Sequence, residues 1–398
     1  MTPASVVCLF FVFLVPLAAA GLALINTGLG RSRSAAHAML ASLLAMAVAA
    51  MVYAAESLFV RGQPLDGSPA SLAVLLQMLG AGLAALIPLS SGADRWRLGA
   101  SCASAALLAG CTYPLFAHWV WGGGWLAQLG ANYGLGHGFL DAGGASSIQV
   151  VGGLTALSVT WILGPRRGKY ATHGAPAAIP GHDAVIVVFA CFLTWLGWLG
   201  LNAAGAILFT GAEAGRAVPI AVNTTLSASA GLLATAAISR VRFGRPDASL
   251  CANGWVGGLV ASSAACAFVT PAGAVAIGLA AGVLVTFTVA YIEWPLGIDD
   301  PGGAISVHAA SGLWGVLAVG IFARSADGVS GQWLAQLVGI ATLIGLVLPL
   351  TYSLNWLLNR VYCQRVAPEG ERQGMDLYEL GAGAYPEFAT HNEEFTQL

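Results

Sequence analysis

Two short segments carry the polar side chains with the clearest chemical potential, and each segment begins with an aspartate. The first is Asp141-Ala-Gly-Gly-Ala-Ser-Ser-Ile-Gln149-Val-Val-Gly-Gly-Leu154, and the second is Asp300-Pro-Gly-Gly-Ala-Ile-Ser-Val-His308-Ala-Ala-Ser-Gly-Leu313. Seven of the fourteen positions are identical at a constant offset of 159 residues. A carboxylate can help a cation to approach, and a carboxamide can hold a small solute through hydrogen bonds. The repeat therefore predicts two matched halves that share a polar site.

The surroundings of these segments must be mostly lipid, because the chain has too few charges to cover a water-facing surface. Of its 398 residues, 57% are hydrophobic and 9% are charged, whereas soluble domains carry about 25% charged residues. The net charge of −2 argues against nucleic acid as a partner. The seven cysteines form no CxxC pair and are interpreted as packing residues, so no metal or cofactor is expected. Neither HExxH nor GxSxG occurs, which argues against an enzyme.

Apolar runs of roughly 20 residues predict membrane-spanning helices. There are eleven such runs: 5–27, 36–60, 70–90, 98–119, 146–164, 183–206, 217–239, 249–269, 273–292, 303–322 and 333–358. With the N-terminus outside and the C-terminus in the cytoplasm, thirteen of the sixteen Lys and Arg residues fall inside, and only Arg61, Arg216 and Arg324 fall outside. No Lys or Arg precedes the first run, so we expect a retained helix rather than a cleaved signal peptide.

This topology makes the repeat an inverted one. Asp141 lies at the outer mouth of the fifth span, which runs inward, and Asp300 lies at the inner mouth of the tenth, which runs outward. Gln149 and His308 each follow their aspartate by eight residues, which is roughly 12 Å of helix from opposite faces. The two side chains should therefore meet near the bilayer midplane, where inverted repeats usually place a substrate site.

Each of these residues also has a structural interpretation. An aspartate at the first turn of a helix caps it, and we expect this role for Asp300 and a capping role compatible with cation recruitment for Asp141. A histidine at membrane depth favours a functional site over simple packing. The assignment of Gln149 to the same site depends on the repeat alone.

Motifs along nearly the whole chain resemble the ammonium transporter/Rhesus family. They are Gly21–Gly30 (GLALINTGLG), Ala93–Arg97 (ADRWR), Ala117–Gly124 (AHWVWGGG), Gly164–Tyr170 (GPRRGKY), Gly197–Asn202 (GWLGLN), Val222–Thr224, Asn253-Gly254 through Thr270-Pro271, Asp299–Pro301 and the tail from Gly374 to Pro386. The resemblance implies an all-α polytopic membrane protein with eleven transmembrane helices. These would form an inverted 5+5 repeat plus a C-terminal helix, with a central pore in each subunit of a homotrimer. It also implies a transmembrane domain over residues 1–360, with repeat halves of about 1–170 and 180–325, and a cytoplasmic regulatory tail over 361–398.

The family's functional positions carry over only in part. Trp121 matches the tryptophan that recruits ammonium at the outer mouth, although an interfacial-belt tryptophan is the alternative, and Asp141 and His308 match their family counterparts. Four positions differ. Gln149 replaces the first pore histidine, Gly80 and Leu201 replace the two gating phenylalanines, and Gly205 replaces a recruiting serine.

Two functions are compatible with these departures. The first is ammonium or ammonia transport across the cytoplasmic membrane through an atypical pore, in which Gln149 cannot titrate and a proton relay between two imidazoles cannot operate. The alternative is a poorly conducting ammonium receptor of the same fold that signals through its tail. The resemblance further implies a cytoplasmic regulatory partner of the PII class.

Overall fold

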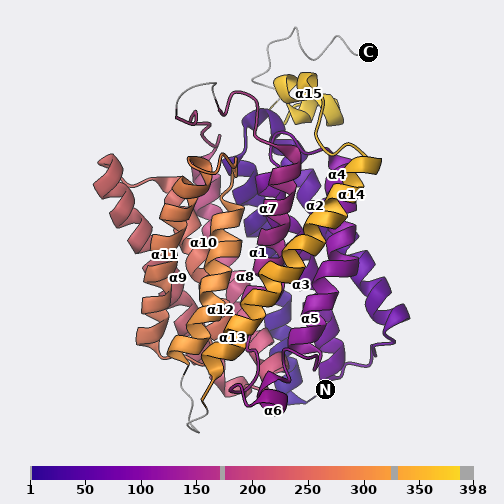
Figure 1. The fold of residues 1–398 in the computed structure, drawn as a ribbon, viewed down its shortest axis with the longest axis vertical. Helices are drawn as coiled ribbons and strands as arrows, with labels where there is room; N and C mark the ends of the chain where they lie inside the picture. The colour runs from indigo at the N-terminus through magenta and orange to yellow at the C-terminus, as the bar shows by residue number, and fades with distance from the viewer. Residues whose placement is uncertain (1, 171–174, 324–329, 386–398) are drawn as a thin grey trace.

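The computed structural model describes residues 2–170, 175–323 and 330–385, and these residues form an all-α protein (Figure 1). Within this part of the chain, ten helices are long and apolar enough to cross a membrane. They span Pro3–Leu29, Ser32–Val60, Pro69–Ser91, Leu98–Trp121, Ala145–Leu163, Ala184–Thr210, Ala214–Phe243, Pro271–Glu293, Ile305–Phe322 and Gln332–Val361. The chain is therefore a multi-pass membrane protein.

Ten of the predicted spans coincide with these helices to within a few residues. The remaining run, predicted over 249–269, corresponds to α10, which covers Ala248–Ala265 and is rich in glycine, serine and alanine. The chain begins α1 at the end of the molecule that carries α6 and leaves α14 at the end that carries α15 (Figure 1), as an odd number of crossings requires. The count of eleven stays a prediction, and Arg324 lies outside the described residues.

Short π-helical segments continue several of the α-helices. The α-helices are α1 (Pro3–Leu29), α2 (Ala35–Ala55), α3 (Pro69–Ser91), α4 (Leu98–Leu107), α5 (Tyr113–Trp121), α6 (Leu129–Tyr133), α7 (Val151–Leu163), α8 (Ala184–Thr210), α9 (Ala217–Phe243), α10 (Ala248–Ala265), α11 (Pro271–Glu293), α12 (Ser311–Phe322), α13 (Gln332–Thr342), α14 (Leu348–Val361) and α15 (Pro368–Gln373). The π-helical segments are Glu56–Val60, Leu108–Thr112, Ala145–Val150, Ile305–Ala310, Leu343–Val347 and Asp376–Leu380.

Several helices begin at a side chain that accepts a hydrogen bond from the first turn. Helix N-termini leave backbone N–H groups without partners, and Ser, Thr and Asp side chains can satisfy them. The capping residues are Thr2, Ser68, Asp183, Asp247 and Thr270. In α1, α3 and α11 a proline follows the cap, where its missing N–H costs nothing.

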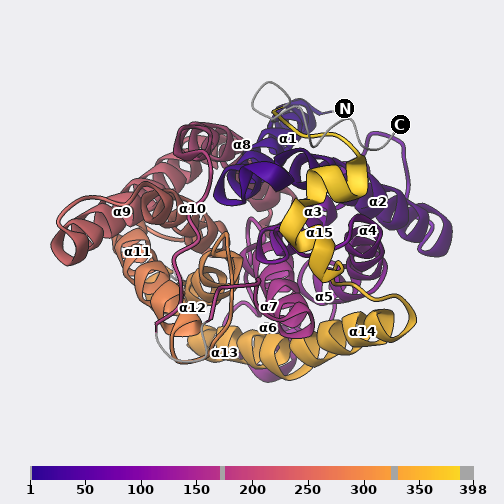
Figure 2. The ribbon, with the colours of Figure 1, turned by 90° about the horizontal axis from the view of Figure 1, so that it is seen from above.

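The two halves of the chain lie side by side, and their first helices pack along one another. Figure 2 shows α1 to α7 on one side, α8 to α12 on the other, and α13 with α14 running along one edge across both. The α1–α8 contact depends on small residues, because a Cβ atom added at Gly197 would lie 2.0 Å from the Ala18 nitrogen. Small residues at a crossing are how helices approach closely in lipid.

The tail folds back onto the end of the molecule that carries α15, which we call the tail end. The carboxylate of Asp376 accepts the backbone N–H groups of Ala36 and His37 at the start of α2. Glu379 accepts the N–H of Leu98 at 2.8 Å and lies 2.9 Å from the His37 ring. The tail boundary at residue 361 and its regulatory role stay predictions, and residues 386–398 lie outside the described residues.

Candidate functional site

The two repeat segments cross at the centre of the molecule, as the sequence predicts. Each enters its helix through a π-helical segment, Ala145–Val150 before α7 and Ile305–Ala310 before α12. A Cβ atom at Gly153 would lie 2.4 Å from the Ala309 nitrogen, and one at Gly312 would lie 2.8 Å from the Ala145 oxygen. These two glycines occupy matching positions of the repeat. The close crossing explains why both positions are glycine.

At this crossing the side chains of Gln149 and His308 meet. The Nδ1 atom of His308 lies 2.8 Å from Oε1 of Gln149, and both residues are buried. A carboxamide oxygen only accepts hydrogen bonds, so Nδ1 of His308 carries the proton and its Nε2 is left as an acceptor. The Nε2 amino group of Gln149 is fully buried and has no partner among the described residues. The pair therefore presents one free donor and one free acceptor.

The carboxylate of Asp141 is hydrogen-bonded to the backbone of its own turn. Its carboxylate accepts the N–H groups of Gly144, Ala145, Ser146 and Ser147 at 2.7–3.0 Å, and also both serine hydroxyls. With so many donors its oxygens have little capacity left for a ligand. The capping interpretation thus describes its contacts, and any influence on a cation would act through charge at a distance.

Asp300 occupies the matching place at the tail end. Its carboxylate accepts the N–H groups of Ala304 and Ile305 at 3.1 and 2.8 Å, and the Ser91 hydroxyl at 2.6 Å. Both repeat helices therefore begin at a capped turn, and the two turns lie at opposite ends of the molecule. The antiparallel course of the repeats follows from these positions.

Trp121 lies beside the Asp141 turn, at the end of α5. Its indole Nε1 donates to the Asp141 backbone oxygen at 2.7 Å. One face of the indole is stacked on Phe209 of α8, with ring centroids 4.2 Å apart and planes 9° from parallel. A tryptophan face can bind a small cation, but in this structure one of the two faces is covered by another aromatic ring.

The three apolar departures are packed against their neighbours. A Cβ atom at Gly205 would lie 2.3 Å from the Ala142 oxygen, so α8 approaches the Asp141 turn too closely for serine. A Cβ atom at Gly80 would lie 2.6 Å from the hydroxyl of Tyr113 and 3.0 Å from Cδ1 of Ile148. Leu201 is buried on α8, immediately before Asn202.

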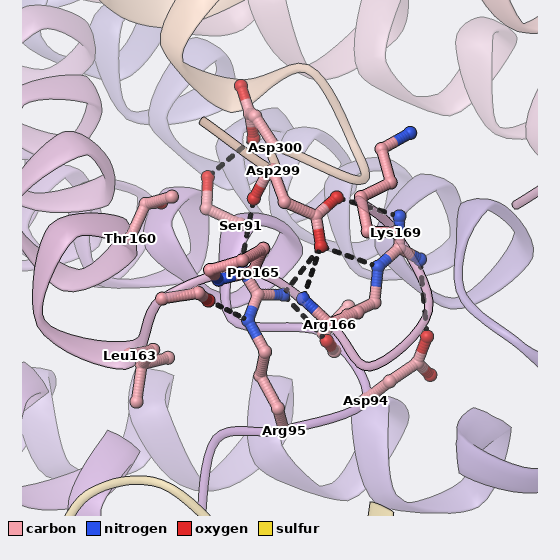
Figure 3. A network of polar contacts seen from close by, with 12 residues as sticks. Ser91, Asp94, Arg95, Thr160, Leu163, Pro165, Arg166, Lys169, Asp299 and Asp300 are labelled. Atoms are coloured by element: carbon pink, nitrogen blue, oxygen red, sulfur yellow. Dashed lines mark hydrogen bonds and ion pairs between the residues drawn. The ribbon is translucent and has the colours of Figure 1, made fainter. Parts of the chain in front are cut away.

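A buried ionic network holds the start of the second repeat at the tail end (Figure 3). Arg166 binds both carboxylate oxygens of Asp299 at 2.9 and 3.0 Å, and it also contacts Asp94 at 3.3 Å. Arg95 donates to the backbone oxygens of Gly164 and Asp299. Burial lowers the pKa of Arg95 to about 10. These residues join loops of the first half to the second half.

Burial alone would raise the pKa of Asp299. The hydrogen bonds and positive charge of Arg166 and Arg95 lower the pKa by more, so it lies below its usual value. Asp299 therefore stays ionised in the network, and its charge is matched by two arginines.

The repeat marks the crossing residues, but no sequence pattern marks three further residues that shape the site. Phe209, Tyr113 and Gln336 come from helices far from the repeat, and no motif marked them. Gln336 of α13 accepts a hydrogen bond from the N–H of Leu140 and donates one to the Leu140 oxygen, both at 2.9 Å. It therefore holds the loop segment before Asp141. A glutamine within the apolar run 333–358 was the available signal in the sequence.

Comparison with known proteins decides the family. The model of the Ammonium Transporter Family matches residues 6–385. This chain belongs to the ammonium transporter family. The ammonium transporter Amt2 of Archaeoglobus fulgidus is 35% identical over 416 residues, which cover 96% of this chain and 88% of that protein. The relatives of this chain are named as ammonium transporters, and the chain is not an enzyme.

Solved structures of the ammonium transporter family share the fold. A structure described as a sensor Amt protein has a TM-score of 0.85 and 27% identity, and the match covers 94% of this chain and 98% of that one. Mep2 of Candida albicans has a TM-score of 0.81 at 22% identity and covers 100% of this chain and 94% of its own, which supports the fold alone. The crossing of two repeat helices described above therefore lies in an ammonium transporter fold.

Proposed function

We propose that the chain carries ammonia across the membrane through a pore that passes between the two repeats. The observation that supports this proposal most directly is the buried contact of 2.8 Å between His308 Nδ1 and Gln149 Oε1. A polar pair at this depth is costly unless a solute or water uses it. Gln149 thus takes over the place of the first pore histidine as a hydrogen-bonding group.

The free groups of the pair suit a neutral molecule. Ammonia has one lone pair, which can accept from Nε2 of Gln149, and three N–H groups, one of which can donate to Nε2 of His308. Ammonium has no lone pair and cannot accept the hydrogen bond that Gln149 offers. We therefore propose that ammonium gives its proton to water at the outer mouth before it reaches Gln149, and that ammonia is the species at the pair.

Recruitment would take place at Trp121, on the side of the indole that Phe209 does not cover. A desolvated cation over a tryptophan face is stabilised by about 2 kcal/mol. Asp141, which is buried and whose backbone oxygen accepts the indole N–H, adds negative charge. Gly205 contributes no hydroxyl, so capture would depend on the aromatic pair and this field.

The remaining expectations complete the proposal at the level of the assembly. We place the protein in the cytoplasmic membrane with its N-terminus outside and its tail in the cytoplasm, as the distribution of Lys and Arg favours. The family resemblance suggests a homotrimer with one pore per subunit and a cytoplasmic partner of the PII class. The tail end, with its docked α15, is the face such a partner would meet.

A second candidate function is ammonium reception without appreciable conduction. Two observations favour it: Phe209 covers one face of the recruiting indole, and a sensor Amt protein is a structural neighbour at 27% identity. In that case ammonium would displace Phe209 from Trp121, and the change would reach the tail through the packed helices. The two functions differ in whether solute crosses the membrane.

The deciding experiment measures transport by the purified protein in proteoliposomes. Ammonium jumps are recorded as current on a solid-supported membrane and as internal pH by stopped flow, beside a Trp121→Ala variant. We expect a saturable alkalinisation that the variant loses, since recruitment depends on the indole. Silence in both assays, together with saturable ammonium binding by calorimetry, would reject transport and favour the receptor.

A further inference from the structure

Gly80 has no room for a side chain because a tyrosine from another helix already occupies the space. The hydroxyl of Tyr113 would lie 2.6 Å from a Cβ atom at position 80, and Cδ1 of Ile148 would lie 3.0 Å from it. Gly80 belongs to α3, Tyr113 begins α5, and Ile148 directly precedes Gln149. Three elements of the first half therefore converge at this point.

Tyr113 lies on the helix that carries Trp121 and beside the residue that precedes Gln149. It precedes Trp121 by eight residues of α5, which is roughly 12 Å of helix. Its hydroxyl and Cδ1 of Ile148 lie 2.6 and 3.0 Å from the same point beside Gly80, and Ile148 directly precedes Gln149. These positions place Tyr113 between the Trp121 indole and the polar pair.

The hydroxyl of Tyr113 is buried without a partner. The residue has 0% exposure, and its oxygen makes no hydrogen bond within the described part of the chain. Its ring packs edge-on against Tyr53, with centroids 5.6 Å apart. An unpaired buried hydroxyl is unfavourable, so a small solute or water must satisfy it for part of the time.

Local backbone geometry sets this orientation. The π-helical segment Leu108–Thr112 ends immediately before Tyr113, and Pro114 follows it. A π-helical turn rotates the following side chains about the helix axis, compared with an uninterrupted α-helix. Such turns are frequent at functional sites. The segment sets the rotation of α5 at Tyr113, which faces Gly80.

We propose that Tyr113 takes the place of the missing aromatic gate, and that its hydroxyl is the last hydrogen-bonding group a solute meets before Gln149 and His308. This inference rests on the proposed function. A phenol hydroxyl accepts from ammonium and both donates to and accepts from ammonia, whereas a phenyl gate can do neither. The ligand class is a small amine, and the space that a glycine leaves limits its size.

The test compares four proteins in proteoliposomes: wild type, Tyr113→Phe, Gly80→Ala and the double variant. Tyr113→Phe keeps the ring and removes one hydrogen bond, so we expect an ammonia flux about fivefold lower. It also vacates the space of one oxygen, so the ratio of methylamine to ammonia flux should rise. Gly80→Ala should reduce both fluxes, and the double variant should recover part of the loss because its Cβ atom no longer meets the hydroxyl.

Tyr352→Phe is the matched control, because this tyrosine is 37% exposed on α14 and packs against Trp161 away from Gly80. It should leave both fluxes unchanged. If Tyr113→Phe matches this control in rate and in selectivity, or if the two substitutions act additively, the gate assignment is wrong. Melting curves in detergent confirm that each variant is folded.

A wild type that conducts nothing would reject the proposed transport, and the gate assignment would then be tested separately. Tyr113 would then be a closed gate, and Tyr113→Ala should give the chain an ammonia flux by clearing the space beside Gly80. Tyr113→Leu replaces it if the alanine variant does not fold. A folded variant that stays silent would overturn the gate assignment.

Discussion

The glycine at position 205 fixes how closely α8 approaches the Asp141 turn. A Cβ atom there would meet the Ala142 oxygen at 2.3 Å, and a backbone oxygen cannot move aside as a flexible side chain can. We therefore expect Gly205→Ser to fail to restore a recruiting hydroxyl and to destabilise the fold by about 1–3 kcal/mol. The apparent melting temperature in detergent measures the effect.

Gly345→Ala is the control for this substitution, because a Cβ atom at Gly345 would meet nothing within 4 Å. It should melt at the wild-type temperature or slightly above, since alanine is the better helix former. Equal melting of the two variants would show that α8 can retreat from the turn.

The Gln149 side chain matters to stability as well as to any solute. In Gln149→Leu the Nδ1–H of His308 would lose its acceptor in a buried site, which costs about 1–3 kcal/mol. We expect a lower melting temperature, together with a lower ammonia flux. Gln373→Leu, at the exposed end of α15, is the comparison and should melt as wild type. An unchanged melting temperature in Gln149→Leu would mean that the His308 ring finds another acceptor.

Among the elements, α13 has a role that no sequence motif indicates. It holds the loop that precedes Asp141. Gln336 binds both backbone groups of Leu140 and the Val316 oxygen. Gln336→Met would leave the two Leu140 backbone groups without the partners they have in this structure, at about 1–3 kcal/mol for each. We expect faster hydrogen exchange at the Leu140 amide, with the amides of α9 unaffected. Protection equal to wild type would show that water replaces the glutamine.

The elements also show what a sequence can predict and where it stops. The repeat placed Gln149 opposite His308 because both follow their aspartates by eight residues in segments of opposite direction, and the contact of 2.8 Å confirms that the two side chains meet. The contacts of Phe209 with Trp121 and of Tyr113 with Gly80 depend on the rotation of helices about their axes. That rotation is set by packing between segments far apart in the chain, and a single sequence gives no measure of it.

For the molecule as a whole, docking of the tail depends on an ionised Glu379. Burial raises the pKa of this carboxyl, but the hydrogen bonds from His37 and the Leu98 N–H lower it by more, so it lies below its ordinary value of 4.5. A depressed pKa in the docked state means that docking is strongest above pH 4.5 and weakens as the pH falls through the docked pKa.

Hydrogen exchange of residues 368–380, corrected for the intrinsic rate at each pH, tests this dependence. Protection should be constant from pH 7 to 5 and should fall below pH 4.5. Glu379→Gln should be less protected at pH 7 and should change less with acid. A wild-type profile that is flat down to pH 3 would contradict the assignment.

The antiparallel repeat helices have a consequence for the direction of flux. Ala145–Leu163 and Ile305–Phe322 point their positive ends toward opposite faces, and each end is neutralised by its own aspartate. The two helix dipoles therefore oppose one another and add no net voltage across the proposed pore. With respect to these dipoles the proposed pore would not rectify, so a reversed gradient should drive solute outward as readily as inward.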